Sequence, residues 1–160
     1  MTGAPALVLD WDGTITERDT LHMVLERFGD LDVFRELEAE LGRRLTLHEV
    51  IAREMRTITA PLDIVQAWLV EHVRLRRGFA ELVEGRDPLL VSAGFHELID
   101  PVLDREGLRV RVIANRLDPR PDGWIAVFRS DRACEVCGEP CKREAVAHLD
   151  RIVYAGDGSS

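Results

Sequence analysis

The sequence predicts an α/β fold, a doubly wound parallel sheet with an inserted small helical cap. Short apolar runs recur along the chain, beginning with residues 6–10, and segments with helical spacing of apolar residues separate them. Strands that alternate with helices favour a parallel sheet covered on both faces. The stretch between the first two runs is helical and too long for a simple crossover. We therefore predict a cap of residues 17–77 inserted into a core formed by residues 1–16 and 78–160.

The predicted cap contains several helices. Residues 21–28 and 31–41 each place apolar side chains at the i, i+3, i+4 spacing of one helical face. Residues 46–49, Thr-Leu-His-Glu, have the pattern of a capping box, which indicates the start of another helix. Pro61 is at a position typical of a further helix start.

The remaining elements alternate between strand and helix. In order, they are a strand at 88–92, a helix at 96–106, a strand at 110–114, a short helix beginning near Lys142, and a strand at 152–154. Residues 123–129, Gly-Trp-Ile-Ala-Val-Phe-Arg, alternate in polarity and are predicted to form half of a hairpin with the preceding segment.

Composition limits the classes of protein that fit. The chain has 160 residues, of which 46% are hydrophobic and 31% charged, as in a soluble globular domain. Its net charge of −8 argues against nucleic acid or an anionic membrane surface as a partner, because neither attracts an acidic protein. No apolar run approaches the length of a membrane span, and the first ten residues lack the basic start of a signal peptide. We therefore expect a cytoplasmic protein.

Polar side chains lie where the predicted strands end. Asp10 and Asp12 follow the first strand, Ser92 ends the second, Asp157 follows the last, and Lys142 begins a helix between the last two. Ligands of an open parallel sheet bind beyond the carboxyl ends of its strands, so these side chains are expected to share one crevice. Carboxylates for attack, proton transfer and Mg²⁺ binding, with a hydroxyl and an ammonium for phosphoryl oxygens, suit phosphoryl transfer.

Four segments carry motifs in a fixed order: DWDGT at residues 10–14, LLVSAGF at 89–95, CKREAV at 141–146 and YAGDGSS at 154–160. They resemble the four motifs of the haloacid dehalogenase-like superfamily of phosphatases, which are DxDGT, a strand ending in Ser or Thr, a lysine, and an acidic segment. The similarity covers essentially the whole chain. It implies the Rossmann-like core of that superfamily.

This resemblance implies a role for each residue. Asp10 is the nucleophile, and Asp12 is the general acid and base whose backbone carbonyl also contacts Mg²⁺. Asp10, Asp12 and Asp157 are then the metal-binding residues. The phosphoryl group is bound by the Ser92 hydroxyl, the Lys142 ammonium and the backbone N–H of Gly94. We therefore expect a Mg²⁺-dependent phosphomonoesterase that acts on a small-molecule phosphate ester, a phosphorylated metabolite, through a phospho-Asp10 intermediate.

The cap resembles that of the phosphoserine phosphatase-like branch in its position in the chain. The segment ANRL followed by Gly123-Trp124 is also similar to that branch. The cysteine-rich run ending in CK is more similar to bacterial phosphatases related to the methionine-salvage enzyme that acts on a methylthiopentenyl phosphate. Asp19 falls where phosphoserine phosphatases carry an acid for the substrate's amino group, and Arg53 or Arg56 corresponds to their cap arginine. We expect these three residues to influence substrate choice.

Cys134, Cys137 and Cys141 lie within eight residues and allow two interpretations. Thiolates at this spacing suit a Zn²⁺ site, but a closed structural site needs four ligands and the sequence shows no obvious fourth. The alternative is three free thiols in a loop. Both interpretations fit a reducing compartment better than a disulfide framework does.

The end of the sequence departs from the superfamily pattern. The fourth motif normally runs on to another aspartate and then to a further helix and strand, whereas this sequence stops at Ser160. We expect either a fragment or an unusually short protein. A last strand without a covering helix predicts self-association, as a homodimer or as aggregates. The absent aspartate predicts weak Mg²⁺ binding. The alternative function is a truncated, weakly active or inactive module that binds a phosphorylated ligand or Zn²⁺.

Overall fold

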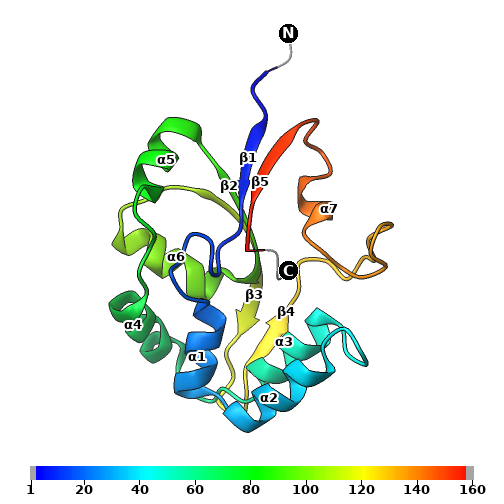
Figure 1. Cartoon of the computed structure of the whole chain (residues 1–160). Coiled ribbons are helices and arrows are strands. Elements are labelled where there is room, and N and C mark those ends of the chain that lie inside the picture. The colour runs from blue at the N-terminus through cyan, green and yellow to red at the C-terminus, as the bar shows by residue number, and fades with distance from the viewer. Residues whose placement is uncertain (1–2, 158–160) are drawn as a thin grey trace.

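In the computed structural model, which describes residues 3–157, five strands form one sheet in the order β4-β3-β2-β1-β5 (Figure 1). The strands are β1 (Ala6–Leu9), β2 (Leu89–Phe95), β3 (Arg111–Asp118), β4 (Ile125–Val127) and β5 (Ile152–Ala155). β1, β2, β3 and β5 run parallel, and β4 pairs antiparallel with β3. The predicted parallel sheet and the predicted hairpin are confirmed.

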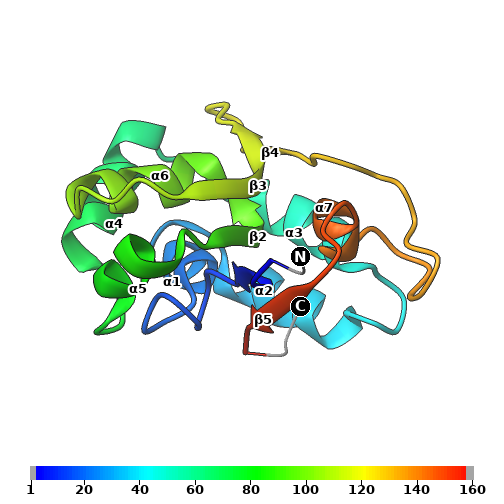
Figure 2. The same cartoon turned by 90° about the horizontal axis from the view of Figure 1, so that it is seen from above.

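Helices cover both faces of this sheet because successive side chains of a buried strand point to opposite sides. Leu9 belongs to the large apolar cluster that also contains Leu98 of α6 (His96–Arg105). Its neighbour Val8 belongs to a smaller cluster with Ala145 of α7 (Arg143–Val146). Figure 2 shows α6 and α7 on opposite sides of the strands. The doubly wound arrangement is therefore confirmed.

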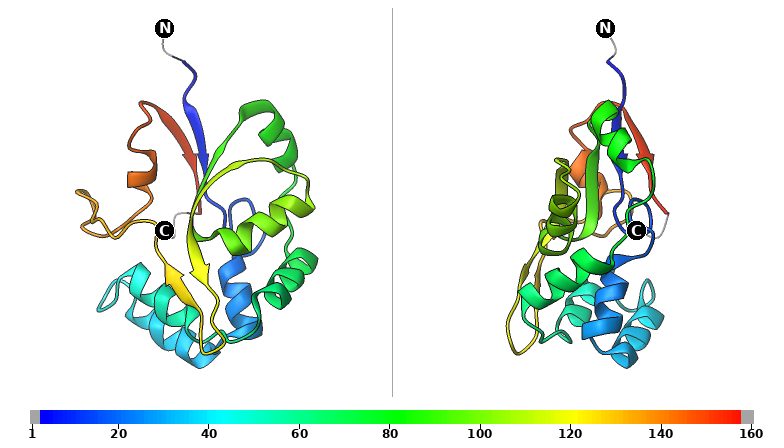
Figure 3. Two further views of the ribbon diagram at one scale, coloured as in Figure 1. Left: turned by 180° about the vertical axis from the view of Figure 1, so that it is seen from behind. Right: turned by 90° about the vertical axis from the view of Figure 1, so that its left-hand side faces the viewer.

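The chain between β1 and β2 is helical. It forms α1 (Thr20–Phe28), α2 (Leu31–Glu40), α3 (Leu47–Met55), α4 (Leu62–His72) and α5 (Phe79–Arg86). Figures 1 and 3 show α1 to α4 gathered beyond the carboxyl ends of β1 and β2, whereas α5 lies beside the sheet. The span predicted as the cap thus contains α1 to α4, which we call the helical insert.

Local capping explains where the first helices of the insert begin. Asp19 and Asp30 are the N-cap residues of α1 and α2, and each side chain accepts hydrogen bonds from backbone N–H groups of the first turn. At α3, Thr46 Oγ1 accepts from the Glu49 N–H (3.3 Å), and Glu49 Oε2 accepts from the Thr46 N–H (2.8 Å). The predicted capping box is confirmed.

Two neighbouring segments connect the helical insert to the sheet. Thr16 and Leu75 form an antiparallel bridge between the segment that enters the insert and the one that leaves it. The Arg76 guanidinium, next in the chain, donates to the carbonyls of Thr14 (2.8 Å) and Gly13 (3.0 Å). The exit of the insert therefore holds the loop that follows β1.

The β3–β4 hairpin also packs on the helical insert. Trp124 is fully buried, and its Nε1 donates to the Ala60 carbonyl (3.0 Å), while its backbone N–H donates to the Ile58 carbonyl (3.1 Å). Gly123 has a φ of +126°, and a Cβ at this residue would overlap the carbonyl oxygen of Arg56. The hairpin thus connects the insert to the sheet at a second place.

β2 is longer than the sequence pattern predicts. It continues beyond Ser92 to Phe95, because Phe95 pairs with Asn115 of β3 after a shift of register that follows Val91. Ser92 and Gly94 therefore lie inside the strand, at the place where its pairing with β3 is irregular. A local irregularity of this kind allows backbone groups to point at a ligand.

β5 is held in the sheet by its pairing with β1. Its Ile152, Val153 and Tyr154 side chains remain between 41% and 49% exposed. Residues 158–160 lie outside the described residues, and so do the end of the fourth motif and the predicted terminus at Ser160. Among residues 3–157, no helix is long and apolar enough to cross a membrane.

Candidate active site

β1 positions Asp10 directly after its last residue. The Asp10 backbone N–H donates to the Ala155 carbonyl (2.9 Å), which extends the pairing of β1 with β5. Asp10 is only 4% exposed. Its Oδ1 accepts hydrogen bonds from the Trp11 backbone N–H (2.8 Å) and from Lys142 Nζ (2.7 Å). One carboxylate oxygen of Asp10 is therefore oriented by two donors.

Lys142 is the only lysine in the sequence. It is the N-cap residue of α7, and the packing of Ala145 against β1 and β2 holds this short helix next to the sheet. The side chains of Lys142 and Asp10 are 17% and 5% exposed. Because little water reaches them, their attraction is stronger than that of a surface ion pair.

Asp12 is held by the first turn of α1. Thr20 donates both its backbone N–H (2.7 Å) and its hydroxyl to Asp12 Oδ1. The pKa of Asp12 is raised to about 7, chiefly by burial of the carboxyl group. The negative charges of Asp19 and Asp10 raise this pKa further, while the hydrogen bonds from Thr20 oppose the rise. Near neutral pH a substantial fraction of the molecules therefore carries a proton on Asp12.

Ser92 and Gly94 face these two carboxylates from β2. The Gly94 backbone N–H donates to Ser92 Oγ (2.9 Å), and Ser92 is 7% exposed. A Cβ at Gly94 would lie 3.2 Å from Ser92 Oγ and 3.5 Å from Asp12 Oδ2. A glycine at this position lets the β2 backbone approach Asp12 without crowding the serine hydroxyl.

The turn that follows β1 brings Asp157 close to the same edge. Gly13 has a φ of +71°, and a Cβ there would lie 2.8 Å from Asp157 Oδ2. Asp10, Asp12 and Asp157 thus lie at the ends of the neighbouring strands β1 and β5. Two carboxylates and the backbone carbonyl of Asp12 form a set of hard oxygen donors that fits Mg²⁺.

A cavity of about 230 Å³ lies between the sheet edge and the helical insert. From the sheet side and α7 it is lined by Asp10, Asp12, Ser92, Gly94 and Lys142, and from the insert by residues that include Asp19, His22, Phe34, Glu38 and Glu54. We call it the active-site cavity. The structure therefore brings the predicted catalytic and phosphate-binding residues together with Asp19. Asp157 lies against Gly13 but is not among the residues that line the cavity.

Two predicted specificity residues lie elsewhere. Arg53 and Arg56 are exposed at the end of α3, and neither lines the active-site cavity. Glu54, which stands between Arg53 and Met55, is 3% exposed and does line it. Consecutive residues of a helix point about 100° apart, so Arg53 faces away where Glu54 faces the cavity. Neither arginine is thus next to the other predicted site residues, and their influence on substrate choice stays a prediction.

A family model of haloacid dehalogenase-like hydrolases matches residues 7–160. The chain belongs to the haloacid dehalogenase-like hydrolase family. The match covers the sheet, the helical insert and all four sequence motifs, so the resemblance seen in the motifs is confirmed.

Several relatives of this chain are named as phosphatases. A 2-hydroxy-3-keto-5-methylthiopentenyl-1-phosphate phosphatase from Brevibacillus brevis is 29% identical over 104 residues, which cover 61% of this chain and 46% of the relative. The enzyme of the same name from Exiguobacterium sp. is 22% identical, over 94% of this chain and 76% of the relative. The chain thus spans about half the length of the Brevibacillus relative that it matches.

Among solved structures, a phosphoserine phosphatase carrying a phospho-aspartyl intermediate analogue superimposes with a TM-score of 0.68. The superposition covers 98% of this chain and 79% of that chain, at 17% sequence identity. A similarity at this low identity shows that the two proteins share the haloacid dehalogenase-like fold.

Two residues that position the site in this haloacid dehalogenase-like chain were not predicted from its sequence. Thr20 holds Asp12 through two hydrogen bonds. Asn115 is 6% exposed; its Nδ2 donates to the Ala93 carbonyl (2.8 Å) and its Oδ1 accepts from the Arg129 N–H (2.9 Å). Asn115 therefore holds the irregular part of β2 in place. The available signal was an amide side chain directly after the apolar run Val112-Ile113-Ala114.

Glu54 was not predicted either. It follows Val50 and Ile51 by four and three residues, so it lies on the buried face of α3. Its Oε1 has no hydrogen-bond partner among the described residues. Burial raises the pKa of Glu54 to about 8, with further contributions from the negative charges of Glu38 and Asp19. A carboxylate at an apolar position of an amphipathic helix was the signal in the sequence.

The three cysteines form a cluster outside the active-site cavity. The Sγ atoms of Cys134, Cys137 and Cys141 all lie within 4.8 Å of one another, and no disulfide joins them. The Val136 N–H points at Cys134 Sγ (3.4 Å). The backbone N–H groups of Cys137 and Val136 lower the pKa of Cys134 to about 6, which favours its thiolate form. The geometry is compatible with both predicted states, a metal site and free thiols.

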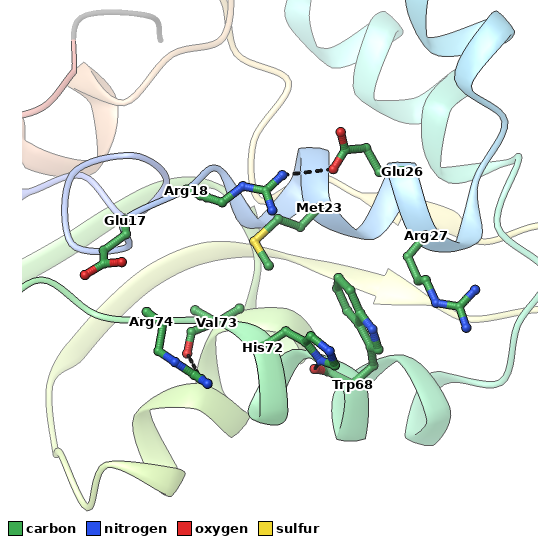
Figure 4. A pocket seen from close by; sticks show the side chains of 9 residues that line it. All are labelled: Glu17, Arg18, Met23, Glu26, Arg27, Trp68, His72, Val73 and Arg74. Carbon is green, nitrogen blue, oxygen red and sulfur yellow. Dashed lines mark hydrogen bonds and ion pairs between the residues drawn. The ribbon is translucent and has the colours of Figure 1, made fainter.

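A second cavity, of about 300 Å³, lies between α1 and the end of α4, and Figure 4 shows the nine residues that line it. Arg18 forms an ion pair with Glu26 (3.0 Å), and Arg74 donates to backbone carbonyls at the end of α4. The Trp68 and His72 rings stack with their centroids 4.5 Å apart. None of the motif residues lines this cavity, and it shares no lining residue with the active-site cavity. It is therefore separate from the active-site cavity.

Proposed function

We propose that the protein is a Mg²⁺-dependent phosphomonoesterase that hydrolyses a small phosphorylated metabolite through a phospho-Asp10 intermediate. The observation that carries this proposal is the convergence of Asp10, Asp12, Ser92 and Lys142 on one cavity, with Lys142 Nζ 2.7 Å from Asp10 Oδ1. The phosphatase names of the relatives support the reaction class.

In the first step, a carboxylate oxygen of Asp10 attacks phosphorus, and the bond from phosphorus to the ester oxygen breaks. Asp12 donates its proton to the departing alkoxide, so the product is an alcohol. The raised pKa of Asp12 supports this role, because a general acid must hold its proton near the working pH. Lys142, the Ser92 hydroxyl and the Gly94 N–H bind the phosphoryl oxygens, whose charge they stabilise.

In the second step, Asp12 is an ionised carboxylate and accepts a proton from water. The water oxygen attacks the phosphorus of the aspartyl phosphate, the bond to Asp10 breaks, and inorganic phosphate leaves. Thr20 keeps the Asp12 carboxylate in the same place for both proton transfers through its two hydrogen bonds. Proton transfer in both directions by one positioned carboxyl group accounts for the burial and fixed orientation of Asp12.

The carboxylates of Asp10 and Asp157 and the backbone carbonyl of Asp12 would hold the Mg²⁺ ion. When bound, Mg²⁺ neutralises part of the negative charge that Asp10 and the phosphoryl group bring together. The contact of Asp157 with Gly13 supports a role for both strand ends in this site.

We also propose that residues 17–77 act as a cap on a core formed by residues 1–16 and 78–160. The cap would close the cavity over the substrate and choose it, while the core performs the chemistry. The paired segments at Thr16 and Leu75 support this division, because they are the covalent connections between the two parts. The β3–β4 hairpin belongs to the core but packs on the cap through Trp124, so it would limit the movement of the cap.

Hydrolysis of p-nitrophenyl phosphate tests the reaction. We expect turnover with Mg²⁺, its loss in EDTA, and its recovery when Mg²⁺ is restored. Asp10→Asn should abolish turnover, whereas Asp122→Asn, at an exposed turn, should leave it unchanged.

Mass spectrometry after acid quenching should find one phosphoryl group on the peptide that contains Asp10. The panel of esters should include phosphoserine and the methylthiopentenyl phosphate named for the relatives. A folded, Mg²⁺-loaded protein that hydrolyses none of these esters would refute the proposal.

We further propose that the cysteine cluster binds Zn²⁺. The three clustered Sγ atoms and the low pKa of Cys134 support a thiolate site, in which water or another ligand would complete the coordination. Competition with a chromogenic chelator should reveal one bound Zn²⁺ per chain in the wild type and none in Cys134→Ser. Equal Zn²⁺ binding by the two proteins would indicate that the cysteines are free thiols.

A further inference from the structure

The insert side of the active-site cavity is acidic. Asp19, Glu38 and Glu54 all line it, from α1, α2 and α3. The basic residues among its described lining are His22 and Lys142. His22 Nε2 faces Glu26 Oε1 at 3.2 Å, and Lys142 is paired with Asp10 on the sheet side. A substrate group that reaches the insert side therefore meets an excess of negative charge.

Glu54 provides an independent indication that a ligand group binds there. It is 97% buried, and its Oε1 has no hydrogen-bond partner among the described residues. An unpaired buried carboxyl oxygen costs about 1–3 kcal/mol, so native proteins rarely keep one without a reason. Since Glu54 also lines the active-site cavity, a donor supplied by a bound ligand would satisfy this oxygen.

The charge of that donor follows from the neighbours of Glu54. Glu38 and Asp19 repel the ionised form of Glu54, as the direction of its pKa shift reflects. A neutral hydroxyl would satisfy one oxygen but leave this repulsion unchanged, whereas a cation would reduce it. A substrate carboxylate would add to the repulsion, because the described lining offers no arginine to bind it.

We propose that Glu54, with Glu38 and Asp19, binds a protonated amino group, so that the substrate is an amino-alkyl phosphate without a carboxylate. This inference rests on the proposed phosphatase function and specifies its substrate class. The phosphoryl group would lie at Asp10 and Lys142, and the ammonium would lie on the insert side. An ammonium that donates to a buried carboxylate forms a charge-assisted hydrogen bond, which is stronger than a bond between neutral groups.

Binding of non-hydrolysable phosphonates tests this proposal without relying on turnover. Calorimetry with the Mg²⁺-loaded protein would compare 2-aminoethylphosphonate with ethylphosphonate, which lacks the amine, and with phosphonoacetate, which carries a carboxylate. We expect the aminophosphonate to bind about 10-fold more tightly than ethylphosphonate, as one charge-assisted hydrogen bond implies. Phosphonoacetate should bind the most weakly of the three.

Substitutions test whether Glu54 causes the preference for the aminophosphonate. Glu54→Gln keeps the shape of the side chain and should reduce the ratio of the two affinities to near one, while Glu54→Asp should keep part of it. Glu36→Gln, at an exposed position on α2, is the matched control and should keep the full ratio. Circular dichroism would confirm that each variant is folded. A wild type that binds ethylphosphonate or phosphonoacetate as tightly as the aminophosphonate would overturn the proposal, and so would an undiminished ratio in Glu54→Gln.

Turnover separates this inference from the proposed function. If phosphoethanolamine is hydrolysed faster than 2-hydroxyethyl phosphate and phosphoglycolate at low concentration, both hold. If p-nitrophenyl phosphate is hydrolysed but the amine gives no preference in binding, the phosphatase function stands and the substrate class is wrong. If the aminophosphonate binds selectively but no ester is hydrolysed, the proposed function fails and the amine site stands.

Discussion

Lys142 Nζ lies 2.7 Å from Asp10 Oδ1, although 132 positions separate the two residues in the chain. The pair joins the N-terminus of α7 to the end of β1 in a largely buried setting. A buried charge that loses its partner is costly, so the removal of either residue should destabilise the position of the other. The pair is therefore a structural contact, and under the proposed function Lys142 also binds phosphoryl oxygens.

Replacement of Lys142 should impair phosphate binding and catalysis together. We expect Lys142→Met to lower kcat/KM for p-nitrophenyl phosphate by about 10²–10³-fold, as removal of an electrostatic stabiliser of the transition state usually does. Steady-state kinetics with Mg²⁺ would measure this loss. Arg151→Met, an exposed cation that precedes β5, is the control and should change kcat/KM less than twofold. A loss below about threefold in Lys142→Met would exclude the assigned role of the lysine.

The general-acid role of Asp12 predicts a dependence on the leaving group. Asp12→Asn should reduce hydrolysis of an alkyl phosphate much more than that of p-nitrophenyl phosphate, because nitrophenolate departs with little help from a proton. The measurement is the ratio of kcat/KM for the two esters in variant and wild type. Equal losses for both esters would contradict proton donation by Asp12.

The buried Glu54 should make stability depend on pH. Its pKa is about 8 in the folded protein, against an ordinary value of 4.5. Below about pH 4.5 the group is protonated in both states and has no effect. As pH rises from there towards 8, only the unfolded chain readily releases the proton, so the free energy of unfolding decreases. Above about pH 8 the effect stays constant.

Glu54→Gln should remove this decrease. We expect the variant to match the wild type near pH 5 and to exceed it by about 1–2 kcal/mol near pH 8, less than the full shift implies because cavity water screens the charge. Thermal melts would show a gain of about 2–4 °C per kcal/mol in a chain of this size. Glu36→Gln should show no pH-dependent difference. A Glu54→Gln variant that is no more stable near pH 8 would mean that Glu54 ionises normally.

The docking of the β3–β4 hairpin on the helical insert depends on Gly123. Gly123→Ala places a Cβ against the Arg56 carbonyl at a backbone φ of +126°, so we expect a loss of about 2–4 kcal/mol in the free energy of unfolding. Gly85→Ala is the matched control, because Gly85 lies inside α5 with open space around it. This control should be neutral or up to about 1 kcal/mol more stable. Urea denaturation would compare the two, and equal stabilities would show that the hairpin moves without cost.

Sequence patterns predicted the order of strands and helices well. β1, β2 and β3 are short apolar runs, α3 begins at a capping box, and residues 123–129 pair with β3. These features follow from local physical chemistry, namely the period of apolar residues, the backbone preferences of turn residues and the side chains that cap helices. The extension of β2 to Phe95 was not predicted, because it depends on a register shift against β3.

The motifs also predicted the residues that line one side of the cavity. The acids after β1, the serine in β2, and Lys142 could be singled out because their chemistry and their positions near strand ends are visible in the sequence. The residues predicted on the cap are not all brought to this cavity. Asp19 lines the cavity, whereas Arg53 and Arg56 do not, and Glu54 was missed.

The sequence by itself therefore determined the family, the doubly wound sheet and the candidate catalytic side chains, because motifs and apolar periods are local properties of the chain. The tertiary structure alone decided which face of α3 closes the cavity, and so placed an acid where an arginine was expected. It also decided that α7 turns Lys142 towards Asp10, and that Trp124 packs on the insert. These arrangements depend on the packing of segments that are far apart in the chain, and that packing is set by the complementarity of surfaces formed only on folding.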